Sequence, residues 1–400
     1  MAAETADTAF EERAAKTGYA NRAHGRHAYL LMVHKNAPQV EMLIRALDHP
    51  DNDIYIHADT RFEDAAPERF ARCAAQSHVY FSSDRAITWG SYDLFETPLF
   101  LLERALEHGP YAYYHLLSGQ DFPLRSQDEI HAFFDGKDCE FVHFCKPEEW
   151  SSTVDDRVRI TRFPKLISGS KPARIIEGLC AQFQKAIGIN HLDDAVSYGF
   201  GANWFSITED LAADMVAHRA WFREHFSHGA LTDEIALQSF ILTFGYEDRL
   251  FRPIGDGSYL GCMRCIEWSA GGDHPRVWRT SDLARLLNSP YMFARKIDMD
   301  VDRELVEKLL KHATPMGSRP KRRPMASRNE DLAHYRLPEP LLSSKKGAWA
   351  GRKESMGGAV GSTGRSAKHR KRKEAPKRTP PFGCTLHHPR SMAQEHVRCG

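Results

Sequence analysis

The sequence has 400 residues, of which 42% are hydrophobic and 10% aromatic, so it can bury a sizeable core as one large domain or two closely associated halves. Its 54 Lys and Arg nearly balance 53 Asp and Glu, and the formal net charge of +1 gives no argument for binding nucleic acid or an acidic polymer. No apolar run reaches the roughly 18 residues of a membrane-spanning helix, and residues 1–26 lack the positive start and apolar centre of a secretory signal, which predicts a cytoplasmic protein.

The first half of the chain alternates strand-like and helix-like patterns. An apolar run predicts a buried strand at 27–34, apolar spacing of three and four predicts a helix at 37–47, and a second strand at 53–57 ends at Asp59. This β-α-β opening with short connections predicts an α/β domain with a mostly parallel sheet flanked by helices. Further elements are expected at 79–82, 92–108, 113–117, 127–134 and 141–144.

The second half of the chain is less regular. Residues 155–171 are rich in Arg and Lys and predict a long surface excursion before a helix at 173–187. The remaining elements are expected at 200–207 (strand), 210–218, 233–243 and 303–312 (helices).

The composition changes at the end of the chain. From residue 314 it turns to Lys, Arg, Gly, Ser and Pro, which cannot bury enough apolar surface to offset the entropy of ordering. We therefore expect a flexible segment at 1–26, one domain at 27–313 and a disordered basic tail at 314–400. The tail is either a solvated extension or a contact for RNA or anionic lipid.

One pair of cysteines, Cys262 and Cys265, has the CxxC spacing. No second pair and no nearby His completes a zinc site. The pair lies in a strand-like run that ends at Trp268, so we expect reduced structural thiols, with a redox-active pair as the alternative.

Polar residues follow two of the predicted strands. Asp59 lies at the carboxyl edge of the sheet, where open α/β folds bind ligands and an acid can accept hydrogen bonds from a nucleoside; the alternative is an ordinary turn residue. The segment LSGQDFPL brings Ser118, Gln120 and Asp121 to another strand end. It is not the nucleophile elbow of a serine hydrolase, because it has a single glycine and no helix starts directly after Ser118.

A third acid precedes an apolar helical pattern. Thr232 or Asp233 can cap the predicted helix, which places Glu234 in its first turn. A carboxylate in that position is stabilised by the helix dipole. It serves either as a capping element or as a base that deprotonates a sugar hydroxyl.

Cations gather towards the end of the domain. Residues 293–296 (FARK), with Arg264 and Arg276 upstream, are either a solvated basic face or a means of neutralising a diphosphate leaving group. The chain has neither a P-loop nor a GxGxxG that follows a strand. Kinases and NAD-dependent enzymes are therefore not indicated.

Seven segments follow one another along the chain: HAYLLMVH, NDIYIHAD, ITWGSYDL, LLSGQDFPL, GANWFSIT, LTDEIALQS and FARKID. In this order and spacing they resemble the core-2/I-branching β-1,6-N-acetylglucosaminyltransferase and peptide O-xylosyltransferase family, over residues 27–313. The resemblance implies a modified GT-A-like nucleotide-sugar transferase fold that lacks the metal-binding Asp-x-Asp. It also implies inversion of the anomeric centre by direct displacement without a divalent cation. The short form looks like the family's bacterial members.

The resemblance implies roles for individual residues. Glu234 in TDEI matches the family's catalytic base, and Lys296 in FARK matches the lysine that holds the diphosphate in place of a metal. Arg276 is expected as a second diphosphate cation and Asp59 as a nucleoside contact. Trp268 matches the tryptophan that walls the acceptor sugar, with a core aromatic as the alternative.

Two further acidic segments are placed by the resemblance. Asp121 is expected on the acceptor side of the site, with a turn-fixing carboxylate as the alternative. The DMD triplet at residues 298–300 is a formal Asp-x-Asp match, but it follows FARK instead of closing an early strand. We therefore expect it to lie at the surface.

The implied substrates are UDP-N-acetylglucosamine or UDP-xylose and a glycan, glycolipid or protein acceptor, with no cofactor, no metal and no specific nucleic acid. Because the sequence shows no membrane anchor, a bacterial polysaccharide or glycolipid acceptor and peripheral contact with the inner face of a membrane are expected. A metal-dependent or retaining transferase using Asp298 and Asp300 is one alternative. A catalytically inactive carbohydrate-binding or scaffold protein with a basic recruiting tail is another.

Overall fold

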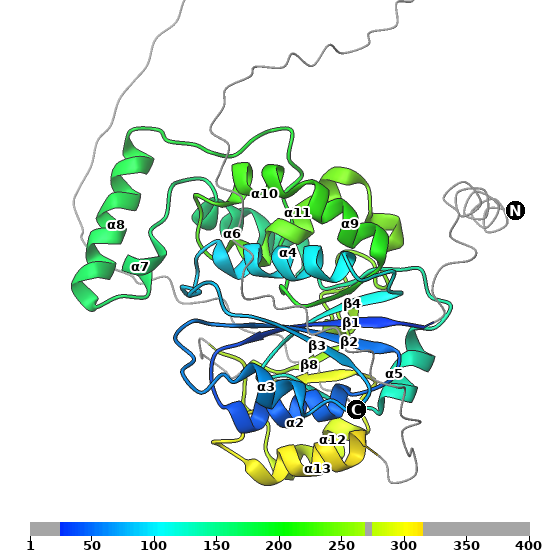
Figure 1. Cartoon of the computed structure of the whole chain (residues 1–400). Coiled ribbons are helices and arrows are strands. Elements are labelled where there is room, and N and C mark those ends of the chain that lie inside the picture. Colours follow the sequence, from blue (N-terminus) through cyan, green and yellow to red (C-terminus); the bar gives the residue numbers. More distant parts are fainter. Residues whose placement is uncertain (1–24, 269–273, 315–400) are drawn as a thin grey trace, which may run out of the picture. The chain divides into compact units, whose positions relative to one another are not determined.

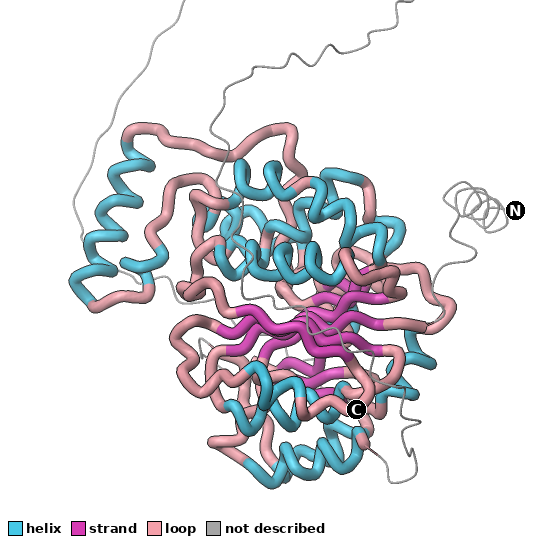
Figure 2. Tube along the Cα trace, in the orientation of Figure 1, coloured by secondary structure: helices cyan, strands magenta, loops and turns pink. Residues whose placement is uncertain are grey.

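The computed structural model describes residues 25–268 and 274–314. Almost all of the predicted basic tail, and most of the predicted N-terminal segment, lie outside the described residues. Within the described part, a six-stranded sheet with the order β3-β2-β1-β4-β7-β6 lies between two layers of helices (Figures 1 and 2). This is the mixed α/β architecture that the sequence predicts.

Four neighbouring strands of the sheet run parallel: β1 (His27–Val33), β2 (Asn52–Ala58), β3 (His78–Ser82) and β4 (Tyr113–Ser118). β1, β2 and β4 are almost wholly buried, as apolar strands between two helix layers must be. Helix α2 (Ala37–Leu47) connects β1 to β2, with the side chain of Asn36 as its N-cap. The β-α-β prediction is confirmed.

Alternate residues of β1 point into two separate hydrophobic clusters. Tyr29 and Leu31 pack on the side of α2 and α13 (Arg303–Ala313). Ala28 and Leu30 pack on the other side, against α4 (Asp93–Leu106) and α9 (Glu209–Ala217). The remaining helices are α3 (Pro67–Ala71), α5 (Gln127–Phe134), α6 (Trp150–Arg157), α7 (Pro164–Ile167), α8 (Lys171–Ala186), α10 (Arg219–Phe226), α11 (Ala236–Phe244) and α12 (Leu283–Leu287).

The rest of the β-structure is antiparallel or mixed. β7 (Phe205–Ile207) pairs antiparallel with both β4 and β6 (Phe141–Val142). A second sheet has the order β5-β9-β8. Its strands are β5 (Phe122–Pro123), β9 (Phe293–Arg295) and β8 (Arg264–Ile266). β5 follows β4 after a short turn and pairs with β9. β9 therefore lies near the carboxyl end of the main sheet.

Two predicted elements in the second half are longer than the observed ones. The strand expected at 200–207 is formed only by β7, because residues 200–204 are a loop. The helix expected at 233–243 begins at Ala236. Both thiols of the CxxC pair are buried, and burial raises the pKa of the Cys262 thiol to about 11. A thiol held in its protonated form suits the structural interpretation of the pair.

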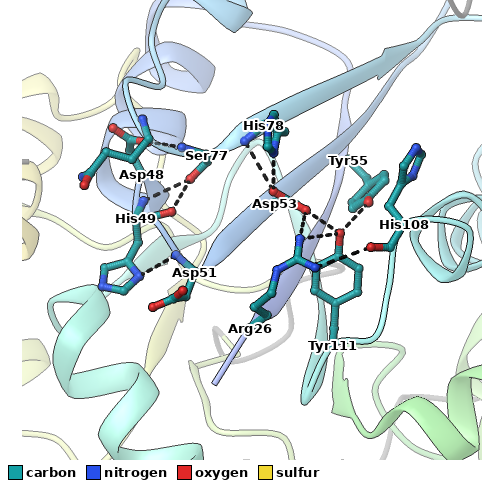
Figure 3. A network of polar contacts seen from close by, with 11 residues as sticks. Arg26, Asp48, His49, Asp51, Asp53, Tyr55, Ser77, His78, His108 and Tyr111 are labelled. Atoms are coloured by element: carbon teal, nitrogen blue, oxygen red, sulfur yellow. Dashed lines mark hydrogen bonds and ion pairs between the residues drawn. The ribbon is translucent and has the colours of Figure 1, made fainter. Parts of the chain in front are cut away.

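The amino end of the sheet is closed by polar contacts (Figure 3). Asp53, at the start of β2, is buried and accepts hydrogen bonds from the side chains of Arg26 and Tyr111. The carboxylate of Asp48 accepts three successive backbone N–H groups of residues 75–77 at 2.8 to 2.9 Å. The opposite, carboxyl edge remains for ligands.

None of the helices in residues 25–268 and 274–314 has both the length and the apolar character needed to cross a bilayer.

Candidate active site

Side chains from several elements meet at the carboxyl edge of the parallel strands. The amide of Ile297, just after β9, donates to the carbonyl of Gln120 at 2.9 Å, which joins the end of β9 to the turn after β4. His34 follows β1, and its pKa is lowered by burial and by the nearby charges of Lys35 and Lys296, whereas Asp59 raises it. Residues that follow four strands of two sheets, β1, β2, β4 and β9, therefore meet at one edge. For Asp59 this is the position expected from the sequence.

Lys296 lies at this edge without an ion-pair partner among the described residues. Its side chain is half-buried, and its Nζ forms no hydrogen bond or ion pair with the residues that the structure describes. Its pKa is lowered by burial and then by the neighbouring charges of Arg295 and Lys35. A desolvated ammonium beside other cations is costly by itself and is relieved by an anion. The position suits an anionic ligand such as a diphosphate.

Asp121 forms an ion pair with Arg295, the residue that precedes Lys296. Asp121 is fully buried, and its Oδ2 accepts hydrogen bonds from the amide and hydroxyl of Ser118 at 2.6 and 2.7 Å and from Arg295 at 2.8 Å. The guanidinium of Arg295 also lies 3.9 Å from the ring centre of Trp204. A carboxylate with no exposed surface does not contact an acceptor sugar. Asp121 therefore shapes the site by fixing its turn and Arg295.

The expectation that the DMD triplet lies at the surface is wrong for Asp298. This residue is only 8% exposed, and its Oδ2 accepts hydrogen bonds at 2.7 Å from Lys35 and from Gln120. Asp300 is exposed and accepts a hydrogen bond from Asn36 at 3.0 Å. Both partners lie far from Asp298 in the sequence, 263 residues for Lys35 and 178 for Gln120. In this structure its carboxylate is engaged by protein groups.

The surroundings of Glu234 also differ from expectation. Thr232–Glu234 form a separate 3₁₀ turn after Leu231, which has a left-handed φ of 53°. Helix α11 begins two residues later and has no side-chain cap, so the prediction that Glu234 lies in the first turn of a capped helix is wrong. The positive charge next to Glu234 comes from Arg157 at the end of α6 and not from a helix dipole. Arg157 donates to Glu234 Oε2 at 2.6 Å.

Glu234 has the features of a general base. Its side chain is 29% exposed, and Oε1 accepts no hydrogen bond from any residue in the described ranges. The contact with Arg157 fixes the orientation of the carboxylate. An oriented carboxylate with one free, accessible oxygen can take a proton from a hydroxyl group.

Contacts around Glu234 show why the segment GANW has glycine at position 201 and asparagine at position 203. The amide of Gly201 donates to the carbonyl of Glu234 at 2.9 Å, and a Cβ at Gly201 would lie 1.9 Å from the carbonyl oxygen of His143, so only glycine fits. Asn203 donates to the buried Asp233 at 3.0 Å. Burial, and then the charge of Glu234, raise the pKa of Asp233 to about 7.

Asn203 and Trp204 join the two halves of the site. Asn203 binds Asp233, which is adjacent to the candidate base, and the next side chain, Trp204, lies under Arg295, which is adjacent to Lys296. One dipeptide thus contacts the neighbours of both Glu234 and Lys296. Group transfer with an anionic leaving group requires a proton acceptor and a cation, and this dipeptide contacts the sequence neighbours of a candidate for each role.

Trp268 lies on the side of the candidate base. It is 43% exposed, and its indole nitrogen donates to the hydroxyl of Tyr259 at 2.7 Å. Tyr259 stacks on His143, and its pKa is raised by burial, with the charge of Glu234 contributing. An exposed indole at this position suits a wall for a sugar ring, whereas a core aromatic would be buried.

Two of the predicted donor contacts are already occupied by protein groups. Both oxygens of Asp59 receive the guanidinium of Arg61 at 2.8 and 2.6 Å, and this contact lowers the pKa of Asp59. Arg276 donates twice to Asp282 at 2.7 Å and lies 3.3 Å from Glu267. The structure thus brings both residues to the site but gives each a partner of opposite charge.

Arg264 is not available to a ligand. It is fully buried between the two sheets and donates to the carbonyls of Leu116 and Phe205 at 3.1 and 2.7 Å. Its contribution to the fold is to tie β8 to the main sheet. A diphosphate contact by Arg264 is therefore excluded in this conformation.

Several residues of the site received no role from the sequence. Trp204 and Arg295 stand inside the segments GANW and FARK, and Arg157 follows two acids in DDR. The segments mark the first two, but no local pattern links Arg157 to Glu234, because the contact spans 77 residues.

Comparison with known proteins adds a family context. The family model for the core-2/I-branching enzyme matches residues 27–287. Human xylosyltransferase 2 is 25% identical over 307 residues, which cover 70% of this chain and 33% of the human protein. Rat xylosyltransferase 1 is 24% identical over 309 residues, which cover 71% of this chain and 35% of the rat protein. The chain thus spans about a third of the length of these relatives.

A search of solved structures finds mouse xyloside xylosyltransferase 1 in its apo form, with 11% identity and a TM-score of 0.27, over 67% of this chain and 96% of that one.

Proposed function

The chain belongs to the core-2/I-branching enzyme family, and on that premise we propose that it is an inverting, metal-independent glycosyltransferase. It moves N-acetylglucosamine or xylose from a UDP-sugar to a hydroxyl of a glycan, glycolipid or protein. Xylose is supported by its relatives human xylosyltransferase 2 and rat xylosyltransferase 1. The observation that supports the proposal is that Asn203 and Trp204 contact Asp233 and Arg295, the sequence neighbours of Glu234 and Lys296.

The reaction is a single displacement at the anomeric carbon. Oε1 of Glu234 takes the proton of the acceptor hydroxyl while the acceptor oxygen forms its bond to the anomeric carbon. The bond from that carbon to the diphosphate oxygen breaks, and UDP leaves with the negative charge. Lys296 stabilises this charge in a partly buried setting, where a fixed cation acts more strongly than in water.

Two features support a reaction without a divalent cation. Lys296 supplies a positive charge, and its Nζ forms no ion pair with any side chain in the described ranges. The carboxylate of Asp298, the more buried acid of the DMD triplet, is held by Lys35 and Gln120. A metal-dependent mechanism through Asp298 and Asp300 would first have to break these contacts.

The acceptor approaches from the side of Trp268 and Glu234. The exposed indole offers an apolar face to one side of a sugar ring, and Tyr259 holds it in place. Asp121 acts at a distance, through Arg295. Asp59 would contact a nucleoside through Arg61, whose side chain is 64% exposed.

The proposal is tested by UDP release from a panel of UDP-sugars, with simple glycosides as acceptors, in excess EDTA. Turnover of UDP-xylose or UDP-N-acetylglucosamine in EDTA supports it and names the donor. Activity that EDTA abolishes and Mn²⁺ restores would point to the metal-dependent alternative. Calorimetric binding of UDP or a glycan without any turnover would point to an inactive carbohydrate-binding protein.

A further inference from the structure

Helix α8 has its polar side turned inward. Its buried residues are Glu177 and Gln184. Glu177 receives the side chain of Arg162 at 2.6 Å, and Gln184 exchanges two hydrogen bonds with the backbone of Thr161, at 3.0 and 2.8 Å. Polar contacts therefore fix the orientation of the helix on the domain. This is the reverse of an ordinary surface helix, which buries its apolar side.

The outward side of α8 carries an apolar stripe. Ile175, Leu179, Phe183 and Ile187 are 64%, 60%, 64% and 58% exposed. They follow one another at intervals of four residues, so they line one face of the helix and its C-cap, and Ile176, 52% exposed, widens this face. Single exposed hydrophobic residues are ordinary, but a contiguous group of this kind marks an interaction surface.

The exposed charged side chains that α7 and α8 themselves place beside the stripe are positive, and one of them, Lys185, pairs with Asp156 of α6 at 3.2 Å. Lys165 on α7 and Lys171, Arg174 and Lys185 on α8 are exposed, whereas Glu177, the single acid in residues 164–187, is buried in its ion pair. At 100° per residue, Lys171, Arg174 and Lys185 lie together along one edge of the stripe. Figure 1 shows α7 and α8 side by side at one end of the helix layer, apart from the main sheet.

We propose that α8 docks the protein on an anionic lipid bilayer. The helix lies in the plane of the membrane, with Leu179 and Phe183 at the boundary of headgroups and acyl chains. The long side chains of Lys171 and Arg174 reach back to the lipid phosphates. The apolar stripe matches the acyl chains of the bilayer, and the cations at its edge match the negative headgroups.

A second copy of the chain fits the stripe less well. In an antiparallel two-fold pair of α8 helices, each edge of one helix lies against the same edge of the other. The basic edges formed by Lys171, Arg174 and Lys185 would then face each other. Like charges in such a contact repel, whereas lipid phosphates neutralise them.

The test is flotation of the full chain with phosphatidylcholine vesicles that either lack phosphatidylglycerol or contain it at roughly one third of the lipid. The variant Leu179→Gln with Phe183→Gln removes the centre of the stripe. The matched control, Phe244→Gln with Val301→Gln, removes two exposed apolar side chains elsewhere. Circular dichroism confirms that both variants are folded.

The wild type and the control are expected to bind the anionic vesicles, and the α8 variant to bind at least about tenfold more weakly. A second variant, Lys171→Gln with Arg174→Gln, is expected to lose the preference for anionic lipid. Equal binding by the wild type and the α8 variant would assign the binding to the basic tail and overturn the proposal. So would a wild type that binds no vesicles, or a dimer that the α8 variant dissociates in sedimentation.

Discussion

Arg157 donates to one oxygen of Glu234 at 2.6 Å, and the other oxygen accepts no hydrogen bond from the residues that the structure describes. This contact orients the candidate base without occupying it. We predict that Arg157→Gln lowers kcat about tenfold to a hundredfold, because a mobile carboxylate is in position less often, while KM for the donor changes little. Steady-state kinetics with saturating donor measure this effect.

The matched control is Arg159→Gln, which removes a cation two residues away whose partner is the exposed Asp155. It is expected to keep wild-type kcat, since exposed ion pairs contribute little. Equal losses in both variants would show that positive charge in this segment, and not the contact with Glu234, matters.

Lys296 and Arg276 are expected to respond in opposite ways. Lys296→Met removes a half-buried cation that has no described partner, so it should raise the melting temperature slightly and weaken UDP binding about tenfold or more. Arg276→Met breaks contacts with Asp282 and Glu267. It should therefore lower the unfolding free energy by about 1 kcal/mol, and with it the melting temperature. Thermal unfolding and UDP calorimetry on both variants separate the two roles. A destabilised Lys296→Met that binds UDP normally would contradict the assignment.

Asp233 makes stability depend on pH. Its pKa is raised from 3.8 to about 7 in the folded protein, so the folded state keeps a proton that the unfolded chain releases. This stabilisation is complete below about pH 4 and is lost as the pH rises through 7. Asp233→Asn should remove this slope and be more stable than wild type at pH 8, by at most about 4 kcal/mol. The exposed Asp194→Asn should keep the slope in the same urea titrations.

A group of buried histidines makes the stability fall at low pH, the opposite of the effect of Asp233. Burial lowers the pKa values of His27 and His115 well below normal, and burial with the charge of His49 lowers that of His131 to about 4. The unfolded chain binds these protons first, so stability is lost as the pH falls from 6.5 towards 4.

His131→Gln should reduce this acid slope by about 1.4 kcal/mol per pH unit. The exposed His312→Gln serves as the control and should leave the slope unchanged. Urea unfolding at several pH values between 4 and 7 measures both slopes. An unchanged slope in His131→Gln would mean that His131 is not a source of the acid sensitivity.

The fold was largely predictable because its signals are local. The apolar run of β1, the helical spacing of α2 and the second apolar run of β2 each show in a window of a few residues. Short connections between them leave few alternatives to a parallel pairing. The antiparallel β7, only three residues long, carries too little pattern to be bounded from sequence.

The sequence proposes candidate residues for the site but does not predict their contacts. The seven segments point to Glu234 and Lys296. No pattern in the sequence predicts the contact between Arg157 and Glu234 or the contact between Lys35 and Asp298. In both pairs the two residues are far apart along the chain. Such contacts are set by tertiary packing.

The most direct test is the turnover of the preferred UDP-sugar by Glu234→Gln in EDTA, with acceptor present. The account predicts that kcat falls by about 10²- to 10⁴-fold while calorimetry shows normal UDP binding, since only the proton acceptor is lost. The exposed Glu224→Gln should match the wild type. A Glu234→Gln variant that turns over donor and acceptor as fast as the wild type would contradict the central claim that Glu234 is the base.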